Sequence, residues 1–236
     1  MKNFTVLLLS FFFFLGINAQ SPIGAWETFY TSESGVKIRT VVIFSEGYQV
    51  ATNYNAENGK FVSTNGGSWK LEGDTMTETI EFDTEKPDRV GSQVSFDIVL
   101  KPNQMGIVGH DMSLKRIDSG EPGKLQGAWL MSGRVRDGKT QTRDTNRPRK
   151  TMKILSGTRF QWIAYNTETK QFMGTGGGTY TTIDGKYTEN LEFFSRDDSR
   201  VGASLEFNFE MIDASWHHKG FSSKGDPMHE IWSKRE

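Results

Sequence analysis

The chain repeats itself. When the sequence is shifted by 111 residues, residues 41–109 align with residues 152–220 without a gap, and 18 of the 69 aligned pairs are identical. The motif "IGAW" at 23–26 returns as "QGAW" at 126–129 with an offset of 103, so the second copy has an eight-residue insertion after its first strand. A repeat of this length indicates two copies of one domain. We expect domains at residues 20–118 and 124–236, joined by a polar linker at 119–123.

Each copy has the pattern of an all-β domain. Segments such as "SFDIVL" and "SLEFNFEM" alternate apolar and polar residues, and turn signals such as "ENGK" and "IDGK" separate them. Helical periodicity is not sustained beyond about one turn. Seven or eight strands in each copy predict two tandem small up-and-down β-barrels, or two sandwiches. A closed barrel has no exposed strand edges and can enclose a small ligand.

The first 19 residues have the pattern of a signal peptide. Lys2 is followed by the apolar run "FTVLLLSFFFFLG", too short to span a bilayer, and by small residues up to Ala19. The chain contains no cysteine, so it has neither a lipid attachment site of the bacterial lipoprotein type nor disulfides. We expect an exported protein, periplasmic or secreted, with no membrane span.

Charge is distributed unevenly along the chain. Residues 21–120 carry 9 Lys and Arg against 14 Asp and Glu, whereas residues 121–236 carry 18 against 15. This asymmetry predicts either docking of the acidic domain on the basic one or two ordinary solvated surfaces. The basic stretch 134–150, which contains the eight-residue insertion and Arg143, Arg147 and Arg149, fits a lid, a contact for the first domain, or a solvated loop. Neither half is basic enough to predict nucleic-acid binding.

Two further stretches predict local shape. The glycines of "GTGGGTY" (174–180) and of the matching "STNGGSW" (63–69) predict bulges or sharp bends in barrel strands. The strand "FQWIAYN" (160–166) carries apolar residues on both faces. Either Trp162 or Ile163 is therefore expected at an interface, and the contact between the two barrels is the candidate.

The ends of each copy carry a family resemblance. Gly24-Ala25-Trp26 and Gly127-Ala128-Trp129 begin the copies, and basic last strands, "SLKR" (113–116) and "EIWSKR" (230–235), end them. This pattern resembles the lipocalin (calycin) family. The second copy, with "GGGTY" and "DGKYTENLEF", also resembles short lipocalin-like domains of exported bacterial proteins of unknown function. The resemblance implies lipocalin-like barrels in which Trp26 packs under Arg116, and Trp129 under Arg235 or Lys234. It implies no particular ligand.

A glutamate recurs on the apolar face of one strand in each copy. In "KYTENLEFF" the residues Tyr187, Glu189, Leu191 and Phe193 share a face, and their counterparts are Met76, Glu78, Ile80 and Phe82. Glu78 and Glu189 are therefore expected to point inward. A buried carboxylate costs several kcal/mol unless it is paired, hydrogen-bonded or protonated.

The second copy adds polar candidates beside its glutamate. If Trp216 faces inward, so does His218, and barrel 2 then holds Tyr187, Glu189, Trp216 and His218 together. The first copy has Met105 and Ile107 in place of Trp216 and His218, so barrel 1 is expected to be a plain core or an apolar pocket.

Three functions are compatible with these residues. The leading interpretation is binding of a small, partly apolar ligand, mainly in barrel 2, by Glu189, His218, Trp216 and Tyr187, with Glu78 in barrel 1. The alternative is a structural or interaction module whose barrels are filled with side chains and whose surface binds a protein or glycan. A third interpretation is an isomerase or hydrolase that uses Glu189 and His218, although no nucleophile is evident. We expect no cofactor and no metal, because His217 and His218 face opposite ways on a strand.

Overall fold

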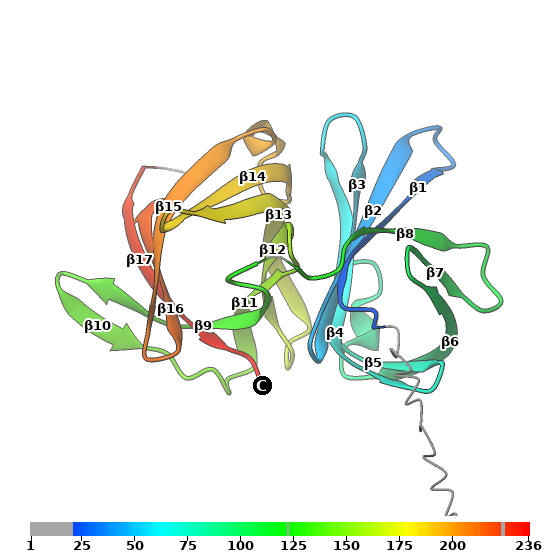
Figure 1. Cartoon of the computed structure of the whole chain (residues 1–236), viewed down its shortest axis with the longest axis horizontal. Coiled ribbons are helices and arrows are strands. Elements are labelled where there is room, and N and C mark those ends of the chain that lie inside the picture. The colour runs from blue at the N-terminus through cyan, green and yellow to red at the C-terminus, as the bar shows by residue number, and fades with distance from the viewer. Residues whose placement is uncertain (1–20, 122, 223–224) are drawn as a thin grey trace, which may run out of the picture.

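The protein is two closed, antiparallel β-barrels in tandem, as the repeat and the strand pattern predicted (Figure 1). The structure is a computed structural model, and it describes residues 21–121, 123–222 and 225–236. The expected signal peptide, residues 1–19, lies outside the described residues.

Barrel 1 is an up-and-down barrel of eight strands, each paired with the next along the chain, and β1 pairs with β8 to close it. Its elements are β1 (Gly24–Thr31), β2 (Lys37–Ser45), β3 (Tyr48–Asn55), β4 (Phe61–Glu72), β5 (Thr75–Asp83), the 3-10 turn η1 (Pro87–Arg89), β6 (Gln93–Lys101), β7 (Gln104–Ile107) and β8 (Ser113–Asp118).

Barrel 2 repeats this architecture and adds one strand. Its elements are β9 (Gly127–Arg136), β10 (Lys139–Thr142), β11 (Arg149–Leu155), β12 (Arg159–Asn166), β13 (Gln171–Ile183), β14 (Lys186–Phe194), the 3-10 turn η2 (Asp198–Arg200), β15 (Ser204–Ile212), β16 (Ser215–Phe221) and β17 (Pro227–Lys234). Strand β9 pairs with both β11 and β17, which closes the barrel. The insertion forms β10, which pairs with β9 as the outer arm of a hairpin.

The repeated glycines lie at bulges, as predicted. The register between β4 and β5 shifts at Gly66/Gly67, and that between β13 and β14 shifts at Gly177/Gly178. A Cβ atom on Gly67 would lie 1.9 Å from the Thr79 carbonyl oxygen. At the matching Gly178 it would lie 2.0 Å from the Asn190 carbonyl oxygen. Only glycine lets the neighbouring strand approach this closely.

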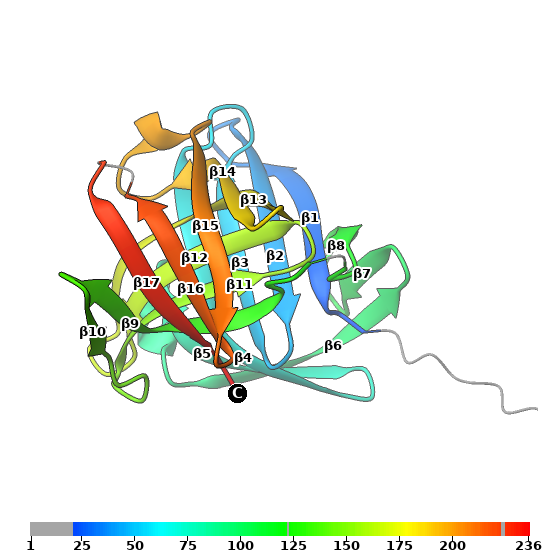
Figure 2. The same ribbon diagram turned by 60° about the vertical axis from the view of Figure 1, so that its left-hand side comes forward.

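The two barrels pack side by side through a shared apolar layer (Figures 1 and 2). Strands β2 and β3 face β11, and β5 faces β12 and β13. The layer consists of the buried residues Ala25, Val41, Ile43, Val50, Tyr54, Phe82, Ala128, Leu130, Met152, Ile154, Ile163, Tyr165 and Phe193. Ile163, rather than Trp162, is thus the interface residue of "FQWIAYN". Strands such as β2 and β11 have both faces buried, one in a barrel and one between barrels.

Polar contacts across this layer are reciprocal. Glu81 of barrel 1 accepts a hydrogen bond from Tyr165 of barrel 2, and Glu192 of barrel 2 accepts one from Tyr54 of barrel 1 at 2.7 Å. Glu81 and Glu192 are equivalent in the repeat, as are Tyr54 and Tyr165. Each barrel therefore gives the other the same pair of residues, which is the contact pattern of a twofold dimer.

Arginines reinforce both glutamates. Arg235 binds Glu81 through two nitrogens at 2.6 and 3.0 Å, and Arg39 binds Glu192 at 3.0 Å. Acidic and basic groups thus cross the interface in both directions, so the pairing does not follow the net charges of the two halves. Among the described residues, no helix has the length and apolar character needed to cross a membrane.

Candidate functional site

The interior of barrel 2 contains the four residues expected there. Tyr187, Glu189, Trp216 and His218 are all buried, with exposed fractions of 0%, 4%, 0% and 1%. Alternation along β14 and β16 therefore identified the inward side chains correctly. These residues do not surround an open space, because Trp216 also packs edge-to-face against Trp129 at 5.8 Å and lies 5.9 Å from Trp232.

The partner of Glu189 is Lys153, on β11. The Lys153 Nζ atom lies 2.7 Å from Oε1 of Glu189, and both side chains are almost fully buried. Four aromatic rings surround the ammonium, with their centroids 5.0 to 6.0 Å from Nζ: Tyr187, Phe207, Trp216 and Trp232. We call Lys153, Glu189 and these four rings the lysine box. It satisfies a buried cation by ion pairing and by cation–π attraction together.

His218 does not pair with Glu189. Its Nδ1 atom lies 3.4 Å from Glu230 Oε2, and no hydrogen bond or ion pair joins His218 to Glu189 in the part of the chain that the structure describes. Burial and the positive charge of Lys153 lower the pKa of His218, so the imidazole is neutral near pH 7. The adjacent His217 faces outward, where its Nδ1 lies 2.9 Å from His229 Nε2. No group of three or more His, Asp or Glu able to hold a metal ion is present in the described segments.

Barrel 1 contains a cavity that is open to solvent and whose floor is a packed cluster that includes Met76, Met105 and Leu114. Its cavity has a volume of about 480 Å³, and all eight strands contribute to its wall. The lining residues are Tyr30, Thr40, Val42, Phe44, Gln49, Ala51, Asn53, Asn65, Met76, Glu78, Arg89, Phe96, Ile98, Met105, Ile107, Met112 and Leu114. This volume lies within the range of small-molecule sites.

The cavity opens at one end of barrel 1. Odd-numbered strands of an up-and-down barrel run in the same direction, so the ends of β1, β5 and β7 lie together. Tyr30 near the end of β1, Arg89 after β5 and Met112 after β7 form this rim. Tyr30 and Met112 are 46% and 44% exposed. A ligand can therefore enter between these side chains.

The opposite end of barrel 1 is closed by Trp26, at the start of β1. The Arg116 guanidinium lies 4.0 Å from the Trp26 ring centroid, and the indole nitrogen donates to the Pro22 carbonyl at 2.8 Å. Trp129 of barrel 2 makes the equivalent hydrogen bond to Leu125.

The structure places Arg235 elsewhere than over Trp129. Lys234 is the residue of β17 opposite Trp129 in the register. Adjacent strand residues face opposite ways, so Arg235 turns toward barrel 1, where it binds Glu81 and lies 4.0 Å from the Tyr48 ring.

Glu78 is the acidic residue of the barrel 1 cavity. Within the described residues it has no hydrogen-bond or ion-pair partner. Burial raises the pKa of Glu78 to about 7, against the lowering effect of the positive charge of Arg89. The Arg89 guanidinium is itself bound to Asp83 at 3.1 Å. Near neutral pH the cavity thus contains a carboxyl group that is partly ionised and without a partner.

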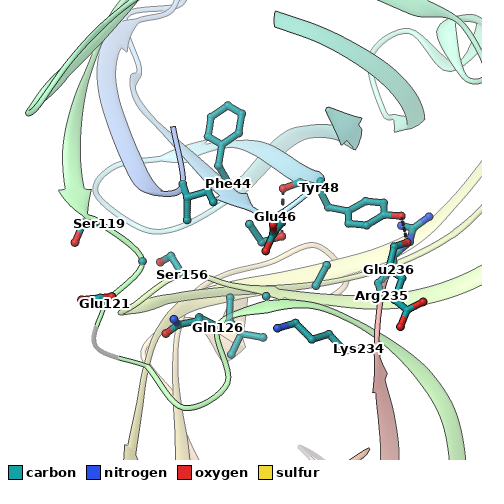
Figure 3. A pocket seen from close by; sticks show the side chains of 17 residues that line it. Phe44, Glu46, Tyr48, Ser119, Glu121, Gln126, Ser156, Lys234, Arg235 and Glu236 are labelled. Atoms are coloured by element: carbon teal, nitrogen blue, oxygen red, sulfur yellow. Dashed lines mark hydrogen bonds between the residues drawn. The ribbon is translucent and has the colours of Figure 1, made fainter. Parts of the chain in front are cut away.

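Two other hollows of comparable size lie on the described part of the molecule. The space between the barrels, about 550 Å³, is lined by the β2–β3 turn, the linker and the C-terminal residues. Figure 3 shows Glu46 from barrel 1 and Gln126 and Lys234 from barrel 2 facing this space. A groove of about 390 Å³ lies beside the basic insertion and includes Arg143 and Arg149.

Sequence reasoning missed Lys153. It lies in "TMKIL", where both faces of the strand are apolar, so alternation gave no signal for the side that faces inward. The repeat did contain a signal for the inward position of Lys153, because Lys153 aligns with Val42 in the first copy. A lysine in place of a valine, in a copy that keeps its inward glutamate, indicates a buried pair.

Comparison with known proteins adds one family match. Residues 124–236, which comprise barrel 2 and the segment leading into it, match the model of a domain of unknown function (DUF4488). No curated protein matches the chain.

Proposed function

We propose that the protein binds a small, partly apolar ligand inside barrel 1. The observation that carries this proposal is the cavity of about 480 Å³ lined by all eight strands, with Met76, Met105 and Phe96 as apolar walls and Glu78 as a polar group. We place the ligand in barrel 1 rather than mainly in barrel 2, because the lysine box fills the corresponding part of barrel 2.

We further propose that both barrels are lipocalin-like. The Arg116 guanidinium over Trp26 and the hollow lumen of barrel 1 support this assignment. Export through the signal peptide is part of the same proposal. N-terminal sequencing of protein from its native cells should start at Gln20, and a chain that retains Met1 would contradict export.

The alternative, a surface-binding module with filled barrels, is supported only for the interior of barrel 2. A catalytic role for Glu189 and His218 has little support, because Glu189 is bound by Lys153 and His218 lies beside Glu230.

Filling the cavity tests ligand binding. Met105→Trp introduces the residue that barrel 2 has at the equivalent position, Trp216, so the larger side chain should occupy the lumen. We expect the protein to stay folded and to lose at least about tenfold in affinity for an apolar fluorescent probe. The readout is probe fluorescence on titration, with circular dichroism as the check of folding.

Val99→Trp, on the exposed outer face of β6, is the matched control and should bind the probe normally. Equal binding by wild type and Met105→Trp would place the probe outside the lumen and contradict the proposal.

A further inference from the structure

The six positions of the lysine box have counterparts in barrel 1, where the lysine is absent. The repeat and the strand pairing align Lys153, Tyr187, Glu189, Phe207, Trp216 and Trp232 with Val42, Met76, Glu78, Phe96, Met105 and Leu114. All six barrel 1 residues line the cavity. The glutamate and one phenylalanine are retained, whereas the lysine and the three largest aromatic residues are replaced by smaller apolar side chains.

These replacements account for the hollow. Trp216 pairs with Trp232 across β16 and β17, and Met105 pairs with Leu114 across β7 and β8. Exchanging two indoles for a thioether and an isobutyl group removes side-chain volume from the wall of the barrel 1 cavity. Methionine side chains adapt their shape to an apolar guest, so the remaining wall can follow a flexible chain.

Barrel 2 also shows which chemical group lies beside the inward glutamate when the barrel interior is full. The Lys153 side chain is a four-carbon chain ending in an ammonium group, and it lies inside the barrel with that group 2.7 Å from a Glu189 oxygen. In barrel 1 the equivalent Glu78 has no cation in the described residues, since Val42 supplies none and Arg89 is bound to Asp83. Glu78 is only partly buried, but a carboxylate in an apolar cavity without a partner is still unfavourable, and a cation entering the cavity would relieve this cost.

We infer that barrel 1 binds a small molecule with a protonated amine on an aliphatic chain, with the Glu78 carboxylate as its counter-ion. The amine would take the place that the Lys153 ammonium has in barrel 2. The inference rests on the proposed function, that the lumen of barrel 1 is a ligand site, and it specifies the chemical class of the ligand. The apolar chain contacts Phe96, Ile107 and Met112, which are apolar lining residues that are not fully buried, and the amine donates hydrogen bonds to the Glu78 oxygens.

The test compares three probes of equal length and different head groups: octylamine, octanol and octanoate. Binding to the full-length protein is measured at pH 8 by calorimetry, where the amine is protonated and most Glu78 is ionised. We expect octylamine to bind on the order of tenfold more tightly than octanol, because the charged pair adds to the contact of the chain. Octanoate should bind most weakly, owing to repulsion by Glu78.

Two variants assign this preference to Glu78. Glu78→Gln should remove the advantage of octylamine while leaving octanol binding unchanged. Val42→Lys introduces a lysine at the position of Lys153 in barrel 2. Its ammonium group should pair with the Glu78 carboxylate, so octylamine should no longer bind. Glu72→Gln, the same change on an exposed side chain of barrel 1, is the control and should bind like wild type.

The pH dependence gives an independent readout. Besides Glu78, the titratable or charged side chains that line the cavity are Tyr30 and Arg89, and Arg89 is paired with Asp83. Protonation of Glu78 removes the counter-ion, so octylamine affinity should fall as the pH drops below about 7 and level off near the octanol value, a total loss of roughly tenfold. Octanol affinity should stay flat over the same range.

The outcomes distinguish a lumen that binds no amine from a lumen that binds no ligand. Equal binding of octylamine and octanol would overturn the amine inference and leave the lumen as an apolar site. Tightest binding of octanoate would also overturn it and assign the head group to Arg89. Binding of none of the probes, to wild type or control, would overturn the proposed function itself.

Discussion

Glu189→Gln should strongly destabilise the protein, whereas the same change at Glu78 should stabilise it. At Glu189 the substitution leaves the Lys153 ammonium buried without a counter-ion, at 5% side-chain exposure. Breaking a buried ion pair in this way costs about 3–5 kcal/mol in the free energy of unfolding, and lowers Tm by roughly 10 °C.

The opposite sign at Glu78 follows from its pKa. Because burial raises this pKa to about 7, the folded protein holds the proton more tightly than the unfolded chain does. Ionisation of Glu78 therefore reduces stability as pH rises from about 4.5 to 7. Glutamine does not titrate, so Glu78→Gln should be more stable than wild type by about 1–2 kcal/mol at pH 8, with the difference falling to about a quarter of this at pH 5 and vanishing below about pH 4.

Chemical denaturation of each variant at pH 5 and pH 8 measures both effects. Glu206→Gln, which removes a solvent-exposed pair with Lys186, is the control and should change stability by less than about 1 kcal/mol. The double variant Lys153→Met/Glu189→Leu should recover most of the stability lost in Glu189→Gln, because it removes both charges. A loss below about 1 kcal/mol for Glu189→Gln would show that Lys153 does not depend on this carboxylate.

Residues 124–236 expressed alone should fold cooperatively and form a homodimer. Separation from barrel 1 exposes the apolar layer that contains Met152, Ile154 and Ile163, each 0% exposed in the full chain. The interface is reciprocal, so a second copy of barrel 2 can offer its own Glu192 to Tyr165, as Glu81 of barrel 1 does. The concentration dependence of the mass in analytical ultracentrifugation measures this association.

Ile163→Glu tests the same interface both in the full chain and in residues 124–236 alone. In the full chain the new carboxylate is buried between the barrels without a partner, which should cost roughly 3 kcal/mol or more. In residues 124–236 alone it lies on the surface, so the variant should be folded and monomeric. A wild-type fragment that stays monomeric at all concentrations would contradict the dimer, and a disordered NMR spectrum would contradict an independent second domain.

The sequence by itself determined the tandem arrangement, the closed all-β barrels and the inward glutamates. The 111-residue repeat revealed two copies, and strand alternation placed Tyr187, Glu189, Trp216 and His218 on one interior face. The repeated glycines marked the bulges, because a backbone approach that excludes Cβ leaves the same residue at both sites. These features are local or periodic, so they can be seen along the chain.

Only the tertiary structure decided which inward residues meet and where space remains. Lys153 approaches Glu189 from β11, three strands away around the barrel from β14, and alternation cannot pair residues across a lumen. Strands such as β11 are apolar on both faces because the other barrel covers their outer side, which hides the inward lysine. The cavity of barrel 1 depends on the summed volume of side chains from eight strands, in which Val42, Met105 and Leu114 replace Lys153, Trp216 and Trp232.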